Sequence, residues 1–212
     1  GVVFLNQTSS ALYAHKIRTS VVLSSLVREG MECRDYRVRY FTRDDDTVYL
    51  LVYAYDRIDS GGRDVYGIDF VLEALRYLDD TIKLVVVDPR SKYIRMIEQF
   101  RNRVLYIPRI VDFEALLRQV DIYIRPRIKD GDSVAIHEAL HAGIPVLASD
   151  CVDRPAGVTL YHDGDLDDFL SKLRETMERS PSEPVRPSDL SSIHDYLGFC
   201  FNVLSTSEAM RG

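Results

Sequence analysis

The sequence predicts an α/β protein with a Rossmann-like, doubly wound parallel sheet, and two observations lead to this prediction. From Thr47 onward, short apolar segments alternate with segments whose apolar residues recur at helical spacing. Such alternation indicates βαβ units, which build a parallel sheet with helices on its faces. The apolar segments are also nearly continuous rather than alternating, which is typical of strands buried on both faces. We therefore expect helices on both sides of one sheet.

The expected elements follow one another along the chain. Segments rich in β-branched and aromatic residues predict strands at 47–55, 82–88, 104–107, 121–125, 145–149 and 158–162. Segments of helical periodicity predict helices at 68–78, 91–100, 112–120, 133–142 and 166–180. The acidic segment RDDDT at 43–47 is expected to be a solvated turn before the first of these strands. One Rossmann-like domain over 47–180 accounts for all of them.

The two ends of the chain fall outside this domain. Residues 1–46 are expected to form a βαβ-like extension or remnant, with strands in GVVFLN and at 36–41 and a helix over 10–29. Residues 181–212 begin with the proline-rich segment PSEPVRP, which indicates a linker, and continue into a last helix around 195–204. Neither end is long enough for a second full domain.

Composition excludes several classes of protein. The 212 residues are 46% hydrophobic and 28% charged, and the net charge is −6, which argues against a general nucleic-acid or anionic-membrane binder. The three cysteines are far apart, which favours reduced thiols and a cytoplasmic setting. No apolar run approaches the roughly 20 residues of a membrane span, so any membrane association is expected to be peripheral. The chain begins with Gly1, so we expect a trimmed or partial sequence.

Cationic residues gather in the segments that follow the expected strands. Ligands of open α/β sheets lie beyond the carboxyl ends of the strands. The cations found there are Arg57, Arg63, Arg90, Arg109, Arg125, Arg127, Lys129 and Arg154. Guanidinium groups suit phosphate, so this edge predicts an anionic ligand, although loops are polar in most proteins. The glycine-rich dinucleotide and P-loop signatures do not occur.

The stretch RPRIKDGDSVAIHEALHAGIPVLASD, 125–150, carries the clearest candidate site. Asp132 or Ser133 suits the N-cap of a helix that Gly143 and the following proline end. Helical spacing places Glu138 off the core face, about 7 Å along the axis from the helix start. The amides of Gly131, Asp132 and Ser133 would lie at the positive end of this helix, with Asp130 just before them. Two carboxylates, Asp130 and Glu138, then bracket a helix-end anion site.

This stretch resembles the donor-binding half of GT-B-fold glycosyltransferases, in particular the retaining family four. The family pattern reads P-S-x-x-E-G-F-G-x-x-x-x-E-A-M-A-x-G-x-P-V-I, and the two acids keep their seven-residue gap here. The segment YGIDFVLEALRYL at 66–78 resembles the family's K-G-x-D helix start, and 104–126 resembles its V-x-F-L-G-x-V block. The resemblance extends over about 47–204, where the last helix corresponds to the family's crossover helix.

The resemblance implies roles for individual residues. Glu138 would bind the ribose hydroxyls of the donor, and Asp130 would stand near the donor sugar, both acting by binding and charge stabilisation. Gly131, Asp132 and Ser133 would face sugar or phosphate, and the 107–110 loop, with Arg109, would touch the base. Tyr66 stands where the family has a lysine that clamps the diphosphate, so Arg57 or Arg63 would supply that charge. Asp130 and Asp132 depart from the family's Glu and Phe.

The resemblance also implies the reaction and its partners. A hexosyl group would pass from a nucleotide-diphosphate sugar to a glycan, a lipid-linked acceptor or another acceptor, without a metal or other cofactor. This chain would be the donor-binding domain and would need an amino-terminal domain or a second subunit to complete the cleft. Nucleic acid is not an expected partner.

Other interpretations compete with this one. The letters HEALH at 137–141 match H-E-x-x-H, in which two histidines hold zinc, but no third ligand is evident and the helix ends at Gly143. The letters DGD at 130–132 imitate the D-x-D metal site of another transferase fold. A non-catalytic nucleotide-binding subunit and a sugar-nucleotide epimerase of the same fold are further alternatives. Cys151, at a strand end, has no evident base beside it.

Overall fold

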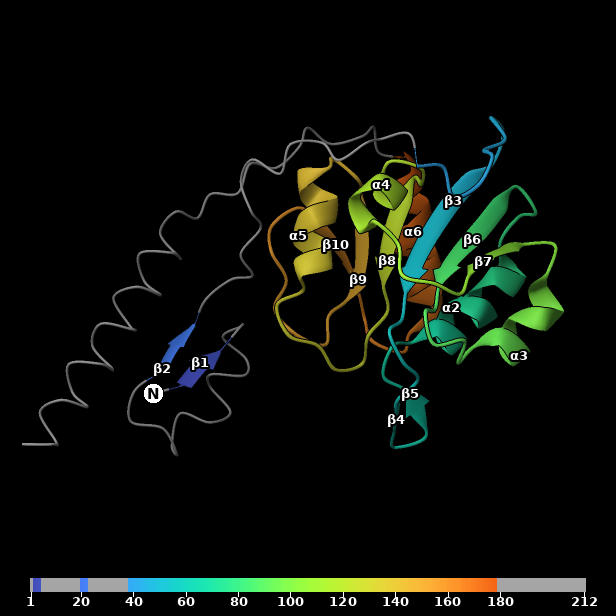
Figure 1. Ribbon diagram of the computed structural model, residues 1–212. Helices are drawn as coiled ribbons and strands as arrows, with labels where there is room; N and C mark the ends of the chain where they lie inside the picture. The colour runs from blue at the N-terminus through green and yellow to red at the C-terminus, as the bar shows by residue number, and fades with distance from the viewer. Residues whose placement is uncertain (1, 5–19, 23–37, 179–212) are drawn as a thin grey trace, which may run out of the picture.

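The computed structural model describes residues 2–4, 20–22 and 38–178, and its centre is a six-stranded sheet whose neighbouring strands are all parallel (Figure 1). The strand order is β10-β9-β8-β3-β6-β7. These strands are β3 (Val48–Tyr53), β6 (Ile82–Val87), β7 (Val104–Ile107), β8 (Ile122–Arg125), β9 (Val146–Ser149) and β10 (Val158–Tyr161). Each lies within a segment that the sequence predicts to be a strand, and the Rossmann-like fold class is confirmed.

The expected helices are also present. They are α2 (Ile68–Ala74) with the 3-10 turn η1 (Leu75–Tyr77), α3 (Ile94–Ile97) with η2 (Glu98–Phe100), α4 (Phe113–Leu117), α5 (Val134–His141) and α6 (Leu166–Glu178). The acidic turn before β3 forms as expected, since the amide of Thr47 donates to the Asp44 carbonyl at 3.2 Å. The expected linker and last helix, 181–212, lie outside the described residues.

Both faces of the sheet are covered, as the apolar strands require. One core cluster joins the sheet to α2, α3 and α6, and the other joins it to α4 and α5 (Figure 1). In β3, Leu50 and Val52 belong to the first cluster, while Tyr49 and Leu51 belong to the second. This alternation follows from the two-residue period of a strand. The fold is thus doubly wound.

The strand order creates a switch point beside β3. The chain runs from β3 outward through β6 to β7, and then returns to β8 on the other side of β3. The connections at the carboxyl ends of β3 and β8 therefore leave in opposite directions and open a crevice, which is where ligands bind in such sheets. After β3 the chain forms a small hairpin of β4 (Asp59–Ser60) and β5 (Arg63–Asp64), which projects beyond the sheet (Figure 1).

Gly67 brings the two connections at this crevice into contact. It caps the start of α2 with a φ of 66°, a conformation that side chains disfavour, and a Cβ atom there would overlap the backbone oxygen of Pro126. The buried Asp64 carboxylate takes the place of a helix cap, because it accepts from the amides of Tyr66 at 3.2 Å and Ile68 at 3.0 Å. It also accepts from the Tyr93 hydroxyl at 2.9 Å.

Two expectations for the amino-terminal segment are wrong where the structure describes it. Ser20–Val22 is a strand, β2, which pairs in parallel with β1 (Val2–Phe4), so the helix expected over 10–29 does not include these residues. Their β-branched valines suit a strand better than a helix. Residues 38–41 form no strand. Tyr40 and Phe41 instead pack against the α4–α5 side of the core, and the Tyr40 amide donates to Gln119 Oε1 at 2.9 Å.

The contact between Gly67 and Pro126 leads to a stability prediction. We expect Gly67→Ala to lower the free energy of unfolding by about 3 kcal/mol, since it combines left-handed backbone strain of about 1–2 kcal/mol with overpacking of about 1–3 kcal/mol. Gly62→Ala is the matched control, because Gly62 has a φ of 79° but no heavy atom within 4 Å of an added Cβ. Urea unfolding of the two variants measures the difference. Equal losses would show that the contact with Pro126 contributes nothing.

Candidate functional site

The candidate site lies where the segments after β3 and β8 meet. The amide of Ile128 donates to the Val65 carbonyl at 3.3 Å, and Lys129 Nζ donates to Ser60 Oγ at 2.8 Å. The β4–β5 hairpin is therefore joined to the segment that leads into α5. The residues that the sequence singles out at 125–133 belong to the segment that forms this junction.

Asp130 is held by arginines from three positions. Its carboxylate accepts from Arg125 Nε at 2.9 Å and Nη2 at 2.8 Å, and from Arg154 Nη1 at 2.7 Å. Arg127 Nε lies 3.7 Å from the same carboxylate. Only 6% of the Asp130 side chain is exposed, and 1% of that of Arg154. We call Arg125, Arg127, Arg154 and Asp130 the arginine cluster.

The arginine cluster carries more positive than negative charge. Burial by itself would raise the pKa of Asp130, but the hydrogen bonds and charges of Arg125 and Arg154 outweigh it and hold that pKa below its usual range. Asp130 is therefore ionised at neutral pH, and one carboxylate faces three guanidinium groups. A partly buried excess of positive charge favours an anionic ligand beside it.

Arg127 differs from its neighbours in what its guanidinium contacts. The group lies 4.0 Å from the ring centroid of Tyr66, which is buried, and its Nε donates to the Lys129 carbonyl at 3.2 Å. Stacking on an aromatic ring holds a guanidinium in place without using its terminal donors. Arg127, from the segment after β8, therefore places a fixed positive charge beside Tyr66, the residue that the resemblance aligns with the family's lysine.

The start of α5 offers donors for an anion. Ser133 is the N-cap residue and is buried, yet its side chain makes no cap hydrogen bond, and within the described residues its Oγ has no partner. The first amides of a helix have no intrahelical acceptor and lie at its positive end. Gly131 and Asp132 precede Ser133 and are half-buried. Asp132 Oδ1 lies 2.7 Å from His137 Nε2, so its carboxylate is oriented by the same helix.

Glu138 is a half-buried acceptor without a hydrogen-bond donor in the part of the chain that the structure describes. Burial raises the pKa of Glu138, and the charges of Glu114 and Asp112 raise it further. It lies one turn after Ser133 on α5, whose Ile136, Ala139 and Leu140 face the core as expected. A carboxylate kept partly buried and unpaired costs stability, so its position suits a ligand better than it suits the fold.

The three arginines predicted to bind the donor are not brought together. Arg63, on β5, is paired through both terminal nitrogens with Asp163 at 2.9 and 2.7 Å. Arg57 is exposed and forms no ion pair with the described residues. Arg109 is exposed beside the aromatic ring of Tyr40, 5.8 Å from its centroid. Their roles in binding remain predictions.

The histidines of HEALH, His137 and His141, do not lie in the surroundings of a zinc site. His137 contacts Asp132, and His141, at the end of α5, is exposed. Among the described residues, no group of three or more His, Cys, Asp or Glu side chains could hold a metal ion. Cys151 lies 3.4 Å from Ser149 Oγ, and burial raises the pKa of its thiol, which does not favour a nucleophile.

Sequence reasoning missed how the cations are partnered. It placed Arg125, Arg127 and Arg154 at this edge, but it gave the binding roles to Arg57, Arg63 and Arg109. The pairing of Arg154 with Asp130 joins residues 24 positions apart. The one available signal is the repetition of Arg-Pro at 125–126 and 154–155 after two successive strands.

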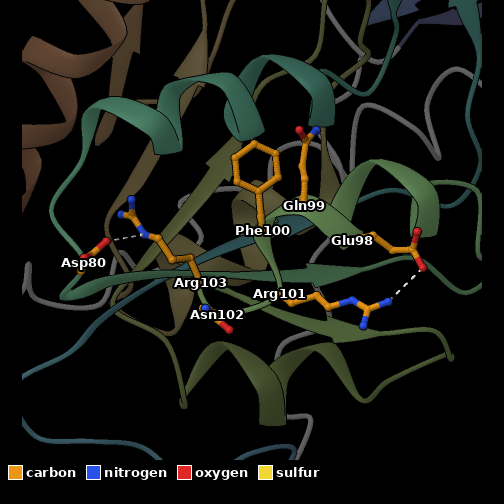
Figure 2. Close-up of a pocket in the computed structure, with 7 residues that line it drawn as sticks. All are labelled: Asp80, Glu98, Gln99, Phe100, Arg101, Asn102 and Arg103. Atoms are coloured by element: carbon orange, nitrogen blue, oxygen red, sulfur yellow. Dashed lines mark hydrogen bonds and ion pairs between the residues drawn. The ribbon is translucent and has the colours of Figure 1, made fainter.

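A separate pocket lies at the opposite edge of the sheet, near the amino ends of β6 and β7 (Figure 2). Its volume is about 640 Å³, and it is lined by Asp80, Glu98, Gln99, Phe100, Arg101, Asn102 and Arg103. Both arginines are already partnered: Arg101 pairs with Glu98 at 3.0 Å, and Arg103 Nη1 donates to the Leu75 carbonyl at 2.7 Å. Leu75 is the C-cap residue of α2, so Arg103 caps the end of that helix, and these contacts give the pocket a structural explanation.

Comparisons with known proteins agree with this fold. Lipopolysaccharide outer core galactosyltransferase WaaB matches with a TM-score of 0.68 at 15% identity, over 94% of this chain and 61% of WaaB. Anabaena HepE, solved with UDP and glucose, matches with 0.58 at 14% identity, over 83% of this chain and 53% of HepE. TarM matches with 0.65 at 14% identity, over 94% of this chain and 43% of TarM. The chain thus spans between 43% and 61% of these structures.

Three further findings complete the comparison. No curated protein sequence matches the chain. None of the helices in the described segments is long and apolar enough to cross a membrane. The model of one sequence family, described as glycosyl transferases group 1, matches residues 60–179 of the 212. This match covers more than half of the chain and includes both candidate carboxylates and all three arginines that surround Asp130. With its GT-B-type Rossmann fold, the chain therefore belongs to the group 1 glycosyl transferases.

Proposed function

We propose that this chain is the donor-binding half of a retaining glycosyltransferase that transfers a hexosyl group from a nucleotide-diphosphate sugar to a glycan or lipid-linked acceptor. The observation that carries the proposal is the combination at the switch point. A positively charged cluster and the buried Ser133 hydroxyl lie at the start of α5, and the Glu138 carboxylate lies one turn further on; within the described residues, neither Ser133 Oγ nor Glu138 has a hydrogen-bond partner.

The two parts of this arrangement suit the two parts of a nucleotide. A diphosphate needs donors and positive charge, which the arginine cluster and the first amides of α5 supply. Ribose hydroxyls need an acceptor that no protein donor occupies, which Glu138 supplies. We assign Ser133 and the amides of Gly131 and Asp132 to the phosphate or sugar, and Glu138 to the ribose.

Asp130 takes part indirectly in this proposal. Both of its oxygens accept hydrogen bonds from arginines, so it contributes to charge stabilisation by holding those arginines in place. No protein side chain is assigned as a covalent nucleophile. The donor needs no metal here, because guanidinium groups and amides neutralise the developing charge on the leaving diphosphate.

The acceptor side is proposed to come from another domain or subunit. Of the exposed large apolar side chains, five lie in segments that follow β3, β6, β7 and β8, at the edge that contains the candidate site. These are Tyr55, Ile58, Ile94, Ile110 and Val134, and Ile110 is 81% exposed. Apolar side chains gathered beside a site favour an interaction surface. Lipopolysaccharide galactosyltransferase WaaB, of which this chain spans 61%, supports the same expectation.

Replacing Glu138 tests the ribose assignment. We expect Glu138→Gln to weaken the binding of the best nucleoside diphosphate among UDP, GDP and ADP by about 1–3 kcal/mol, the range for a charged hydrogen-bonding partner. Isothermal titration calorimetry measures the loss, and Glu73→Gln, on the exposed side of α2, is the control. Unchanged affinity in a folded variant would contradict the assignment.

The same variant should gain stability at neutral pH. The folded-state pKa of Glu138 is raised, so this group favours the folded state at low pH and costs stability once the pH rises through that pKa. We expect Glu138→Gln to unfold at higher urea than the parent at pH 7, by about 0.5–2 kcal/mol, and to lose this advantage near pH 3, below the usual Glu pKa of about 4.3. If Glu138→Gln is no more stable than the parent at pH 7, the ionised Glu138 carboxylate does not destabilise the fold.

A metal assay separates this proposal from a zinc hydrolase. We expect the purified protein to contain no stoichiometric zinc, measured by inductively coupled plasma mass spectrometry. His141→Ala should leave nucleotide binding unchanged, because the His141 side chain is exposed at the end of α5. One equivalent of zinc that is lost in this variant would favour the hydrolase.

A transfer assay tests the need for a partner. We expect the 212-residue chain to bind its donor but to transfer little sugar to lipid-linked and simple sugar acceptors, since the acceptor side is proposed to come from another domain or subunit. Robust transfer by the monomer would contradict this part of the proposal.

A further inference from the structure

Arg127 is the member of the arginine cluster whose donors are free for a ligand. Arg125 uses Nε and Nη2 on Asp130, and its Nη1 lies 3.3 Å from the Tyr123 hydroxyl. Arg154 uses Nε on the Ser149 carbonyl and Nη1 on Asp130, and its Nη2 lies 3.5 Å from Cys151 Sγ. The two terminal nitrogens of Arg127, in contrast, have no acceptor among the described residues.

The Arg127 guanidinium is nevertheless held in place. It lies 4.0 Å from the Tyr66 ring centroid, its Nε is bonded to the Lys129 carbonyl, and 17% of its side chain is exposed. A guanidinium held in this way loses little conformational entropy when it binds a ligand. Arg57 is exposed and has no ion-pair partner among the described residues to fix it, and Arg63 is occupied by Asp163, so neither combines an open pair of donors with a fixed position.

The surrounding charges favour an anion at this guanidinium. Asp130 neutralises only one of the three arginines around it, and it is already bonded to Arg125 and Arg154. Arg127 is 3.7 Å from Asp130, which is beyond a hydrogen bond, so its charge remains available. Asp130 stands three positions before Ser133, whose buried hydroxyl has no described partner. The open donors therefore belong to the same short segment as the start of α5.

We infer that Arg127, stacked on Tyr66, binds the β-phosphate of the donor, the phosphate that carries the sugar, and that Asp130 is a positioning residue that fixes the arginine cluster around it. This inference rests on the proposed function and assigns the clamp to the segment after β8, in place of Arg57 or Arg63. The two terminal nitrogens of Arg127 match two oxygens of one phosphate, and a nucleoside monophosphate has no second phosphate to offer them.

The test compares nucleoside diphosphate with the corresponding monophosphate by calorimetry. The parent chain should bind the best of UDP, GDP and ADP more tightly than its monophosphate. Arg127→Gln should weaken the diphosphate about 10- to 100-fold and leave the monophosphate nearly unchanged, as expected for loss of one charged fork. Tyr66→Phe keeps the ring and should retain the preference for the diphosphate. Arg101→Gln, at the opposite edge, is the control for the loss of an arginine.

The outcomes separate this inference from the proposed function. If Arg127→Gln leaves the ratio of diphosphate affinity to monophosphate affinity unchanged while the parent binds tightly, the assignment of Arg127 alone is overturned. If this affinity ratio falls in Arg57→Gln and not in Arg127→Gln, the diphosphate is bound by the segment after β3 instead. Absence of nucleotide binding in the parent chain would overturn both. Glu138→Gln should weaken diphosphate and monophosphate equally, because both carry the ribose.

Discussion

The buried pairing of Asp130 with Arg125 and Arg154 is the constraint on which the candidate site depends. It connects the end of β8, the segment before α5 and the segment after β9 through one carboxylate. Removing one partner of a buried ion pair typically costs about 3–5 kcal/mol, because the other charge is left without compensation. The cluster is thus held together by its single acid, and the same acid leaves part of the positive charge unneutralised for a ligand.

The sheet places this cluster where a ligand can reach it. Because β3 lies between β6 and β8, the connections on its two sides diverge at the carboxyl edge. Gly67 then allows the start of α2 to approach Pro126, which brings Tyr66 beneath Arg127. The Asp64 carboxylate and the Tyr93 hydroxyl anchor the same turn from the core side. Burial raises the pKa of Asp64 although these hydrogen bonds oppose it, so the anchor carries a cost of its own.

Stability and binding make opposite demands at α5. Its core face is apolar and closes the sheet, while Ser133 at its start and Glu138 off that face have side chains without a hydrogen-bond partner among the described residues. Groups of this kind are expected at ligand sites, where the ligand supplies the missing partner. The repulsion from Glu114 and Asp112 adds to the cost at Glu138, and no described cation offsets it.

The sequence by itself determined the elements and their arrangement, because burial on both faces demands continuous apolar strands, and helices repeat at 3.6 residues. All six strands of the main sheet and all five helical segments beside it lie where the pattern predicts them. The preference of Asp132 or Ser133 for an N-cap predicted where α5 starts, and helical spacing predicted its core face and the position of Glu138 off that face. The strand at Ser20–Val22 was misjudged, because its pairing with Val2–Phe4 is a contact between distant segments.

Tertiary structure decided which charges are partnered. Arg63 and Arg127 look alike in the sequence. In the structure, Asp163, 100 positions away, accepts hydrogen bonds from Arg63, whereas Arg127 stacks on the Tyr66 ring and keeps its terminal donors open. The motif alone gives no partner for the Asp130 carboxylate, but in the structure Arg154, from the connection after β9, donates a hydrogen bond to it. Local periodicity carries no information on such pairs, because they depend on which strand ends the fold brings together and on how closely Gly67 lets two connections approach.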